Sequence, residues 1–139
     1  MNAARLYKVT SILLLLFGVG HTSGLYRHQD FGMEGNQVFD AMHVVPIQVM
    51  GRAHTFWDFY VGFGLLVSVL FFFTGVLAWQ LGALCDRQKE VVKVLAWPFF
   101  LCQAVVAVLC CTNFFLMPIA FSIAIASVSG LAAYRVGAV

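Results

Sequence analysis

The amino-acid sequence predicts an all-α fold: an integral membrane four-helix bundle with a short amphipathic outer helix between spans one and two. Of the 139 residues, 62% are hydrophobic and only 10% are charged, whereas about a quarter of the residues in a soluble domain are charged. The mean hydropathy of +0.92 over the whole chain leaves little sequence for a soluble domain. We therefore expect one membrane domain that covers residues 1–139.

Four apolar runs reach the length of about 20 residues that is needed to cross a hydrocarbon core of about 30 Å. They cover about residues 6–25, 55–81, 91–111 and 114–134. The first run has a second interpretation, because Arg5 and Lys8 followed by a short apolar stretch also resemble a secretory signal peptide. We favour a retained span, since no A-x-A-like cleavage site is present.

The connections between the runs differ in length. The short segment ALCDRQKE joins spans two and three, and a turn near Thr112 and Asn113 joins spans three and four, which favours neighbouring antiparallel helices. The first connection, about residues 26–54, is long for a compact bundle. Its segment QVFDAMHVVPIQVM has apolar residues at helical spacing before Pro46. We expect a short amphipathic helix there that lies on the outer membrane face and caps the bundle.

The distribution of lysine and arginine predicts the orientation of the chain. Arg27 and Arg52 lie in the long connection, and the other six basic residues flank the opposite ends of the spans: Arg5, Lys8, Arg87, Lys89, Lys93 and Arg135. Under the positive-inside rule both termini are cytoplasmic and the long connection faces outward. The expected location is the cell membrane, which in a bacterium is the inner membrane with the periplasm on the outer side.

Cysteine usage and charge argue against two functional classes. The four cysteines contain no C-x-x-C pair and do not form a disulfide framework. The net charge of +2 comes without a clustered basic stretch, so nucleic acid is not an expected partner.

Small residues spaced four apart favour close packing of the helices. They are Gly20 and Gly24, Gly64 and Ser68, and Ser122, Ala126 and Gly130.

Ionisable side chains are concentrated in one window of this apolar chain. All four histidines and four of the six carboxylates lie between positions 21 and 58: His21, His28, Asp30, Glu34, Asp40, His43, His54 and Asp58. His54 and Asp58 stand four residues apart and project from one helical face. The carboxylate of such a pair orients the imidazole as a general base. In the alternative interpretation, Asp58 caps the helix and His54 faces water.

Asp58 is the strongest candidate in the window. The rings and glycines of FWDFYVGFG surround it about one turn inside the expected membrane interface. A buried carboxylate there either pairs with a cation, for which Arg52 is the nearest candidate, or stays protonated. His21 is expected at a similar depth and can meet Asp58 across a helix interface, or else bond to a backbone carbonyl. The candidate catalytic residues are therefore His21, His54 and Asp58.

Four further residues are candidates for ligand binding. Asp40 and His43 lie three apart on the expected outer helix, Trp57 belongs to the outer aromatic belt, and Asn113 lies at the outer end of span three. The window contains the nitrogen and oxygen donors of a zinc or iron site, but not the spacing of a known metal motif. We assign no metal ligands and leave the cofactor open, with axial haem ligation by paired histidines as an alternative.

Two segments, GVGHTSG and HTFWDFYVGFGLLVS, resemble an uncharacterised family of small four-span bacterial membrane proteins, and the resemblance covers most of the chain. It implies a four-helix membrane fold and a role for His21 and Asp58, and it implies no reaction. Vitamin K epoxide reductases are similar in span number, but their C-x-x-C is missing here. Four-span relatives of glutathione transferases are similar as well, without a counterpart to their arginine-rich and asparagine motif. DoxX-type proteins are a distant alternative, similar in size and topology.

Two functions follow from these observations. The first is a membrane site that binds a lipophilic small molecule, or acts on it by acid/base chemistry, through His21, His54 and Asp58. The second is a non-enzymatic scaffold or accessory subunit that binds a membrane-protein partner or forms a homo-oligomer. Ion passage is disfavoured, because no span carries an ionisable residue near its centre. Whether the chain is an enzyme stays open at this point.

Overall fold

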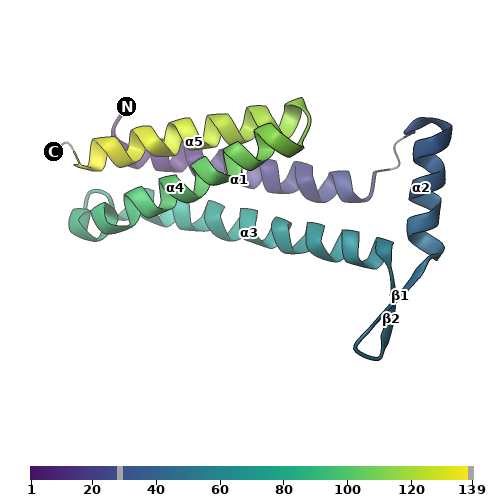
Figure 1. Cartoon of the computed structure of the whole chain (residues 1–139). Coiled ribbons are helices and arrows are strands. Elements are labelled where there is room, and N and C mark those ends of the chain that lie inside the picture. The colour runs from purple at the N-terminus through teal and green to yellow at the C-terminus, as the bar shows by residue number, and fades with distance from the viewer. Residues whose placement is uncertain (28–29, 138–139) are drawn as a thin grey trace. The chain divides into compact units, whose positions relative to one another are not determined.

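The computed structural model describes residues 1–27 and 30–137 of the chain. The helices of this described part are α1 (Ala3–Leu25), α2 (Gly32–Val44), α3 (Phe56–Leu84), α4 (Lys89–Asn113) and α5 (Leu116–Gly137). Two short strands, β1 (Pro46–Val49) and β2 (Arg52–Thr55), lie between α2 and α3 (Figure 1). His28 belongs to the sequence window of ionisable residues and lies outside the described residues.

Four of these helices, α1, α3, α4 and α5, are long and apolar enough to cross a membrane. Each corresponds to one of the four apolar runs within three residues at either end, and α2 forms the short helix that was expected between spans one and two. The predicted fold class, an all-α four-helix membrane bundle with a short outer helix, is therefore confirmed. Such an arrangement is that of a multi-pass membrane protein.

Contacts within the chain define two compact units. The first comprises residues 1–18 and 71–139, and the second comprises residues 19–70. The first unit thus contains the start of α1, the end of α3 and all of α4 and α5, whereas the second contains the end of α1, α2, the strands and the start of α3. The expectation of one membrane domain stays a prediction.

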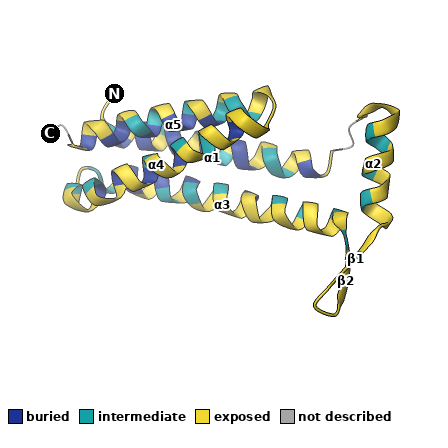
Figure 2. Ribbon diagram, in the orientation of Figure 1, coloured by how far each residue is buried: buried dark blue, intermediate teal, exposed yellow. Residues whose placement is uncertain are grey.

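The first unit has a core of apolar side chains from all four of its helical segments. The faces that α1, α4 and α5 turn toward their neighbours are buried, and the opposite faces are exposed (Figure 2). The core residues are Leu6, Tyr7, Leu14, Phe17, Ala78, Leu81, Val92, Ala96, Phe99, Ile125, Ala132, Ala133 and Val136. Their burial on helix stripes, with exposed residues between them, is the pattern expected where lipid covers the outer faces.

Glycines let backbones approach closely in this first unit. A Cβ atom on Gly82 of α3 would lie 2.9 Å from the carbonyl oxygen of Ala4 in α1. A Cβ on Gly130 of α5 would lie 2.7 Å from the Phe100 ring of α4. Because lipid supplies no hydrophobic drive for helices to associate, contacts of this kind carry much of the packing energy.

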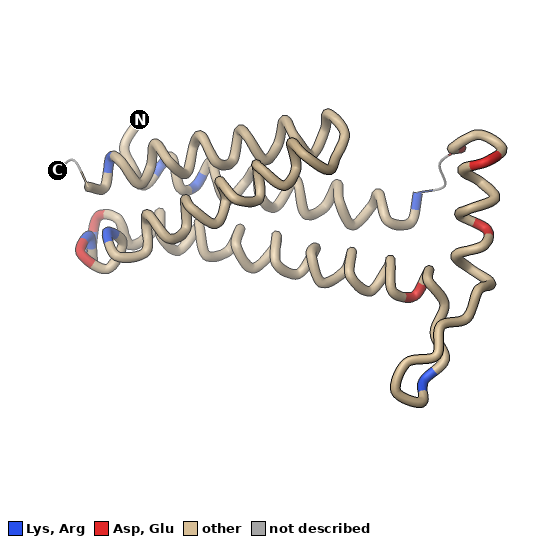
Figure 3. The backbone as a smooth tube through the Cα atoms, in the orientation of Figure 1, with Lys and Arg blue, Asp and Glu red and all other residues tan. Residues whose placement is uncertain are grey.

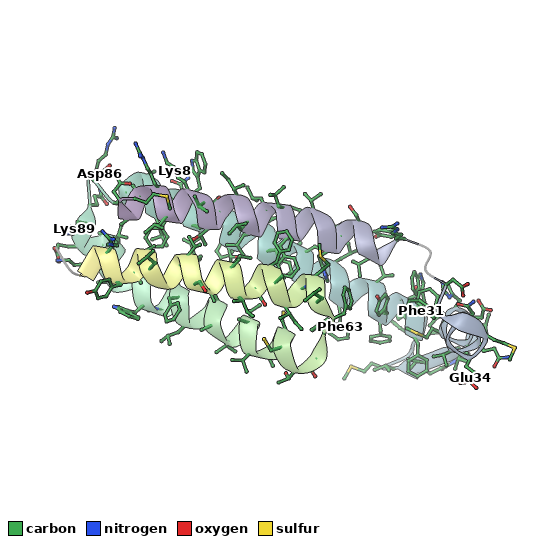
Figure 4. The ribbon with its side chains drawn as sticks, turned by 90° about the horizontal axis from the view of Figure 1, so that it is seen from above. Lys8, Phe31, Glu34, Phe63, Asp86 and Lys89 are labelled. Carbon is green, nitrogen blue, oxygen red and sulfur yellow. The ribbon has the colours of Figure 1, made fainter. Side chains whose placement is uncertain are left out.

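The basic residues of the first unit gather at the end where both termini lie (Figure 3). Lys8, Asp86 and Lys89 are seen together at this end in Figure 4. Lys8 lies over the Trp79 ring, with 5.4 Å between Nζ and the ring centroid. Lys93 donates to Glu90 over 3.0 Å. Both contacts join a lysine at this end of the first unit to a partner on an apolar helix.

In the second unit, a small polar network joins α1 to α3. His21 Nε2 donates to the Gly64 carbonyl oxygen (3.1 Å), and Thr22 Oγ1 donates to Ser68 Oγ (2.9 Å). Ser68 Oγ in turn donates to the same Gly64 carbonyl (3.0 Å). The Leu25 side chain lies directly against Gly64, so a Cβ atom there would force Leu25 to move.

The small residues that were expected to favour close packing differ in their contacts. Gly64 and Ser68 both lie in the contact between α1 and α3. In contrast, no described atom lies within 4 Å of a Cβ atom built on Gly20 or on Gly24. The G-x-x-x-G of α1 was expected to favour close packing, and within the described residues it does not, because its two glycines lie on an open part of the helix.

The two strands form an antiparallel hairpin, with Pro46 opposite Thr55 and Val49 opposite Arg52. This hairpin was not anticipated from the sequence, where Pro46 was interpreted only as the end of a helix. Both turn residues have a positive φ, 51° at Met50 and 79° at Gly51. Such a two-residue turn matches the twist of the strands but suits Asn-Gly better than Met-Gly. Met50 therefore occupies a strained conformation, and it is fully exposed.

Rings hold α2 against the start of α3. Trp57 stacks on His43, with 4.2 Å between centroids, and meets the edge of Phe39 at 5.1 Å. Within this unit α2 runs across the direction of α3 (Figure 1). Because a spanning helix runs roughly along the membrane normal, this orientation fits a helix that lies in the plane of the interface.

Candidate functional site

The start of α3 is fixed by a reciprocal pair of hydrogen bonds. The Thr55 amide donates to Asp58 Oδ2 (2.8 Å), and the Asp58 amide donates to Thr55 Oγ1 (3.2 Å). This is a capping box, in which two side chains satisfy backbone donors that have no partner within the helix. The alternative interpretation, that Asp58 caps the helix, is therefore part of its role.

The same carboxylate faces His54. Asp58 Oδ2 lies 3.7 Å from His54 Nδ1, an ion-pair distance when the imidazole is protonated and too long for a direct hydrogen bond. Both side chains are half exposed, 48% for His54 and 53% for Asp58. Asp58 was expected to be buried, where it either pairs with a cation such as Arg52 or stays protonated. It is half exposed instead, because α3 extends past its neighbour α1 in this unit.

The extent of that projection follows from one contact. Leu25, the last residue of α1, packs on Gly64 of α3. Gly64 is eight residues after Phe56, where α3 begins, so about 12 Å of α3 lies beyond the end of α1 at a rise of about 1.5 Å per residue. The His54–Asp58 pair thus lies at the protruding start of α3.

A shallow groove runs down α3 from this pair. It has a volume of about 390 Å³ and is lined by His54, Asp58, Phe59, Gly62, Phe63 and Leu66. Asp58, Gly62 and Leu66 are spaced four apart on α3 and therefore follow one helical face, and His54 lies near the end of β2 just before that helix. No described atom lies within 4 Å of a Cβ atom built on Gly62, which leaves the floor of the groove open. Phe63 projects from α3 with 63% of its surface exposed (Figure 4).

His21 lies elsewhere in the same unit. Its ring bonds to the Gly64 carbonyl, which is the second of the two interpretations given for it, and it does not line the groove. The contact fixes a tautomer with the proton on Nε2, since a carbonyl oxygen can only accept. Among the three candidate catalytic residues, the structure brings His54 and Asp58 together and gives His21 a different partner.

The four candidate ligand-binding residues also lie in different parts of the structure. His43 Nδ1 donates to the Phe39 carbonyl (2.8 Å) while its ring stacks on Trp57, so both residues hold α2 to α3. Asp40 is exposed on α2. Asn113 belongs to the first unit, where its amide donates to Leu109 O and Thr112 Oγ1 at the end of α4. A role for these residues in ligand binding stays a prediction.

Among the described residues, no group of three His, Cys, Asp or Glu side chains lies close enough to hold a metal ion. Cys85, Cys102, Cys110 and Cys111 are free thiols. Burial raises the pKa of the Cys85 thiol, and the neighbouring Asp86 carboxylate raises it further.

The apolar part of the groove was missed in the sequence. Phe59, Gly62, Phe63 and Leu66 were interpreted as ordinary residues of a span. A signal was present, since continuing from Asp58 in steps of four residues leads to Gly62 and then to Leu66 on one face of α3. No family model, curated protein or solved structure matches this chain, so the site is argued from its own geometry.

Proposed function

We propose that this multi-pass membrane protein binds a lipophilic small molecule along the outer end of α3. The observation that carries the proposal is the groove itself, which has a polar end at His54 and Asp58 and an apolar floor and walls. Ligand sites typically combine apolar lining with a few convergent polar groups. An amphiphile fits this order of side chains, with its head at the His54–Asp58 end and its tail toward Leu66.

The proposed function is binding rather than a defined reaction. The 3.7 Å separation of His54 Nδ1 and Asp58 Oδ2 allows the carboxylate to stabilise a protonated imidazole. His54 is then the group available for proton transfer to a bound molecule. Acid/base chemistry would need a reacting atom of the ligand held against the His54 ring. The open groove contacts a bound molecule from one side only.

We further propose that both termini are cytoplasmic and that the groove lies on the outer side of the cell membrane, which is the inner membrane in a bacterium. The support is the gathering of Lys and Arg at the end of the first unit that contains the termini (Figure 3). Positively charged ends of spans are retained in the cytoplasm.

The experiment uses an uncharged dodecanol that carries a photoreactive diazirine in its chain. The purified protein in phosphatidylcholine nanodiscs is irradiated with the probe, and crosslinked residues are mapped by peptide mass spectrometry. We expect crosslinks within residues 54–66. Replacing Gly62 by Leu should remove them, because the new side chain fills the open floor without a clash.

Gly20→Leu is the matched control, since Gly20 also lies on a helix with open space around it but does not line the groove. Its crosslinks should equal those of the wild type. Crosslinks spread evenly over all lipid-facing helices, or unchanged in Gly62→Leu, would refute the groove as a binding site.

A role as an accessory subunit is the second candidate, and a separate observation favours it. A groove of about 450 Å³ on the first unit is lined mainly by small residues of α4 and α5: Phe100, Ala104, Ala107, Ile123, Ala126, Ser127, Gly130 and Leu131. Small residues let another helix approach closely. A larger complex after gentle detergent extraction, lost in Ala107→Phe, would support this function; a monomer of unchanged size would oppose it.

A further inference from the structure

We infer that the head of the bound amphiphile is a primary ammonium group, which carries N–H donors that a choline head lacks. This inference rests on the proposed groove and specifies the class of molecule that it takes. The feature behind it is the pairing state of Asp58. Its Oδ2 atom receives the Thr55 amide and faces His54, whereas its Oδ1 atom has no hydrogen bond among the described residues. One carboxylate oxygen at the head of the groove is therefore available to a donor.

The other lining side chains suit a cation. Phe59 and Phe63 line the groove next to Asp58, and the face of an aromatic ring attracts a positive charge. Neither Lys nor Arg is among the lining residues. An ammonium head would thus meet a carboxylate oxygen and ring faces, while an aliphatic tail would follow Gly62 toward Leu66.

The charged residues of the second unit also favour a cationic ligand. Residues 19–70 carry two arginines, Arg27 and Arg52, and four carboxylates: Asp30, Glu34, Asp40 and Asp58. Unlike the basic end of the first unit, this segment attracts cations from the headgroup region.

An anionic head is the opposing case, because a helix N-terminus attracts negative charge. Here that end is already occupied by the Asp58 carboxylate, which receives the Thr55 amide. A second anion would meet the carboxylate at close range, and only a protonated His54 would favour it. The cation is therefore the better complement to the groove.

The test compares three photoreactive probes with the same diazirine-bearing dodecyl tail and an ammonium, a hydroxyl or a sulfate head, in phosphatidylcholine nanodiscs. A charge-assisted hydrogen bond predicts half-maximal crosslinking of residues 54–66 at a roughly tenfold lower concentration of the ammonium probe than of the hydroxyl probe. Asp58→Asn, which keeps an oxygen acceptor for the cap, should remove this preference. Asp40→Asn, on α2 and outside the groove, should retain it.

Competition distinguishes a membrane amphiphile from a soluble amine. Phosphatidylethanolamine added to the nanodisc should lower crosslinking by the ammonium probe, and free ethanolamine at equal concentration should not. Equal competition by free ethanolamine would overturn the inference, because a head without a tail makes no use of the groove.

The remaining outcomes separate this inference from the proposed function. Equal crosslinking by all three probes that disappears in Gly62→Leu would leave the groove as a binding site and refute the ammonium preference. Stronger crosslinking by the sulfate probe would refute it as well. Absence of crosslinks to residues 54–66 with every probe would refute both.

Discussion

Asp58 caps α3 together with Thr55, and it also belongs to the proposed ligand groove. The hydrogen bonds between them start α3, and the remaining carboxylate oxygen of Asp58 lies at the head of the groove. A substitution of Asp58 alone would change both the helix cap and the proposed ligand contact. A substitution of Thr55 weakens the cap and leaves the Asp58 carboxylate in place.

Thr55→Ala removes the hydroxyl acceptor and leaves the carboxylate. Loss of an N-cap side chain costs typically about 1 kcal/mol, so the first turn of α3 should open more often. Amide hydrogen exchange of residues 56–60 should accelerate several-fold, while crosslinking by the ammonium probe should persist. Unchanged exchange would mean that Thr55 is not the cap.

Met50 is the second residue with a defined consequence. Its φ of 51° is unfavourable for a side chain with a Cβ, and no contact holds the exposed side chain there. Met50→Asn should relieve strain of roughly 1 kcal/mol, since Asn tolerates this conformation. Amide exchange over residues 46–55 should then slow. Gly51→Ala, at φ 79°, should have the opposite effect; a hairpin insensitive to both changes would contradict the turn.

At the scale of elements, the contact between α1 and α3 in the first unit depends on Gly82. A Cβ there would lie 2.9 Å from the Ala4 carbonyl oxygen, and a backbone atom cannot move aside as a side chain does. Gly82→Ala should therefore destabilise the protein by about 1–3 kcal/mol, the usual range for overpacking. Thermal unfolding in detergent measures the loss.

Gly20→Ala is the control for this prediction, because it makes the same chemical change in α1 where no described atom of another segment lies within 4 Å of the new Cβ. It should leave the stability unchanged or raise it by about 0.5–1 kcal/mol through better helix propensity. Equal destabilisation by Gly20→Ala and Gly82→Ala would contradict the packing described for the first unit.

The helices were predictable from the sequence because run length alone decides whether a segment can cross a bilayer. The hairpin was not, because its turn carries Met50 and Gly51 in place of Asn-Gly, and because its strands are only four residues long. Pro46 correctly marked the end of α2 but also opens β1. A short strand after a proline leaves no periodicity to detect.

The candidate site was predictable in part. The spacing of His54 and Asp58 indicated a shared face, and the structure has them 3.7 Å apart. Their exposure could not be foreseen, because it depends on where Leu25 meets Gly64 and hence on how far α3 extends beyond α1. Residue spacing in the sequence predicts which side chains share a face of one helix, but it does not predict how far that helix extends beyond its neighbour.

At the scale of the whole molecule, the proposed orientation can be tested through a native thiol. Cys85 lies between α3 and α4 on the proposed cytoplasmic side. In a variant with Cys102, Cys110 and Cys111 replaced by Ser, a membrane-impermeant maleimide should label Cys85 in inverted vesicles and not in intact cells.

The pH dependence of this labelling has a defined sign. Burial and Asp86 raise the pKa of Cys85, so the reactive thiolate is scarcer than for an ordinary cysteine at neutral pH and increases as pH rises. Labelling should therefore be faster at pH 8.5 than at pH 7. Met50→Cys in the same background, on the exposed hairpin turn, should label from the outside instead. Labelling of Cys85 in intact cells would contradict the proposed orientation and indicate the opposite one.

The unequal lengths of the spans have a consequence for the bilayer around the protein. The 29 residues of α3 extend about 43 Å, well beyond a hydrocarbon core of about 30 Å, and in the proposed orientation the groove lies in the part beyond the core. Bilayer thickness then sets how deeply the groove is immersed. Crosslinking by the ammonium probe should increase from short-chain to long-chain nanodiscs, as the lipid surface rises toward His54 and Asp58. The protein would thus bind its amphiphile according to the thickness of the membrane in which it resides.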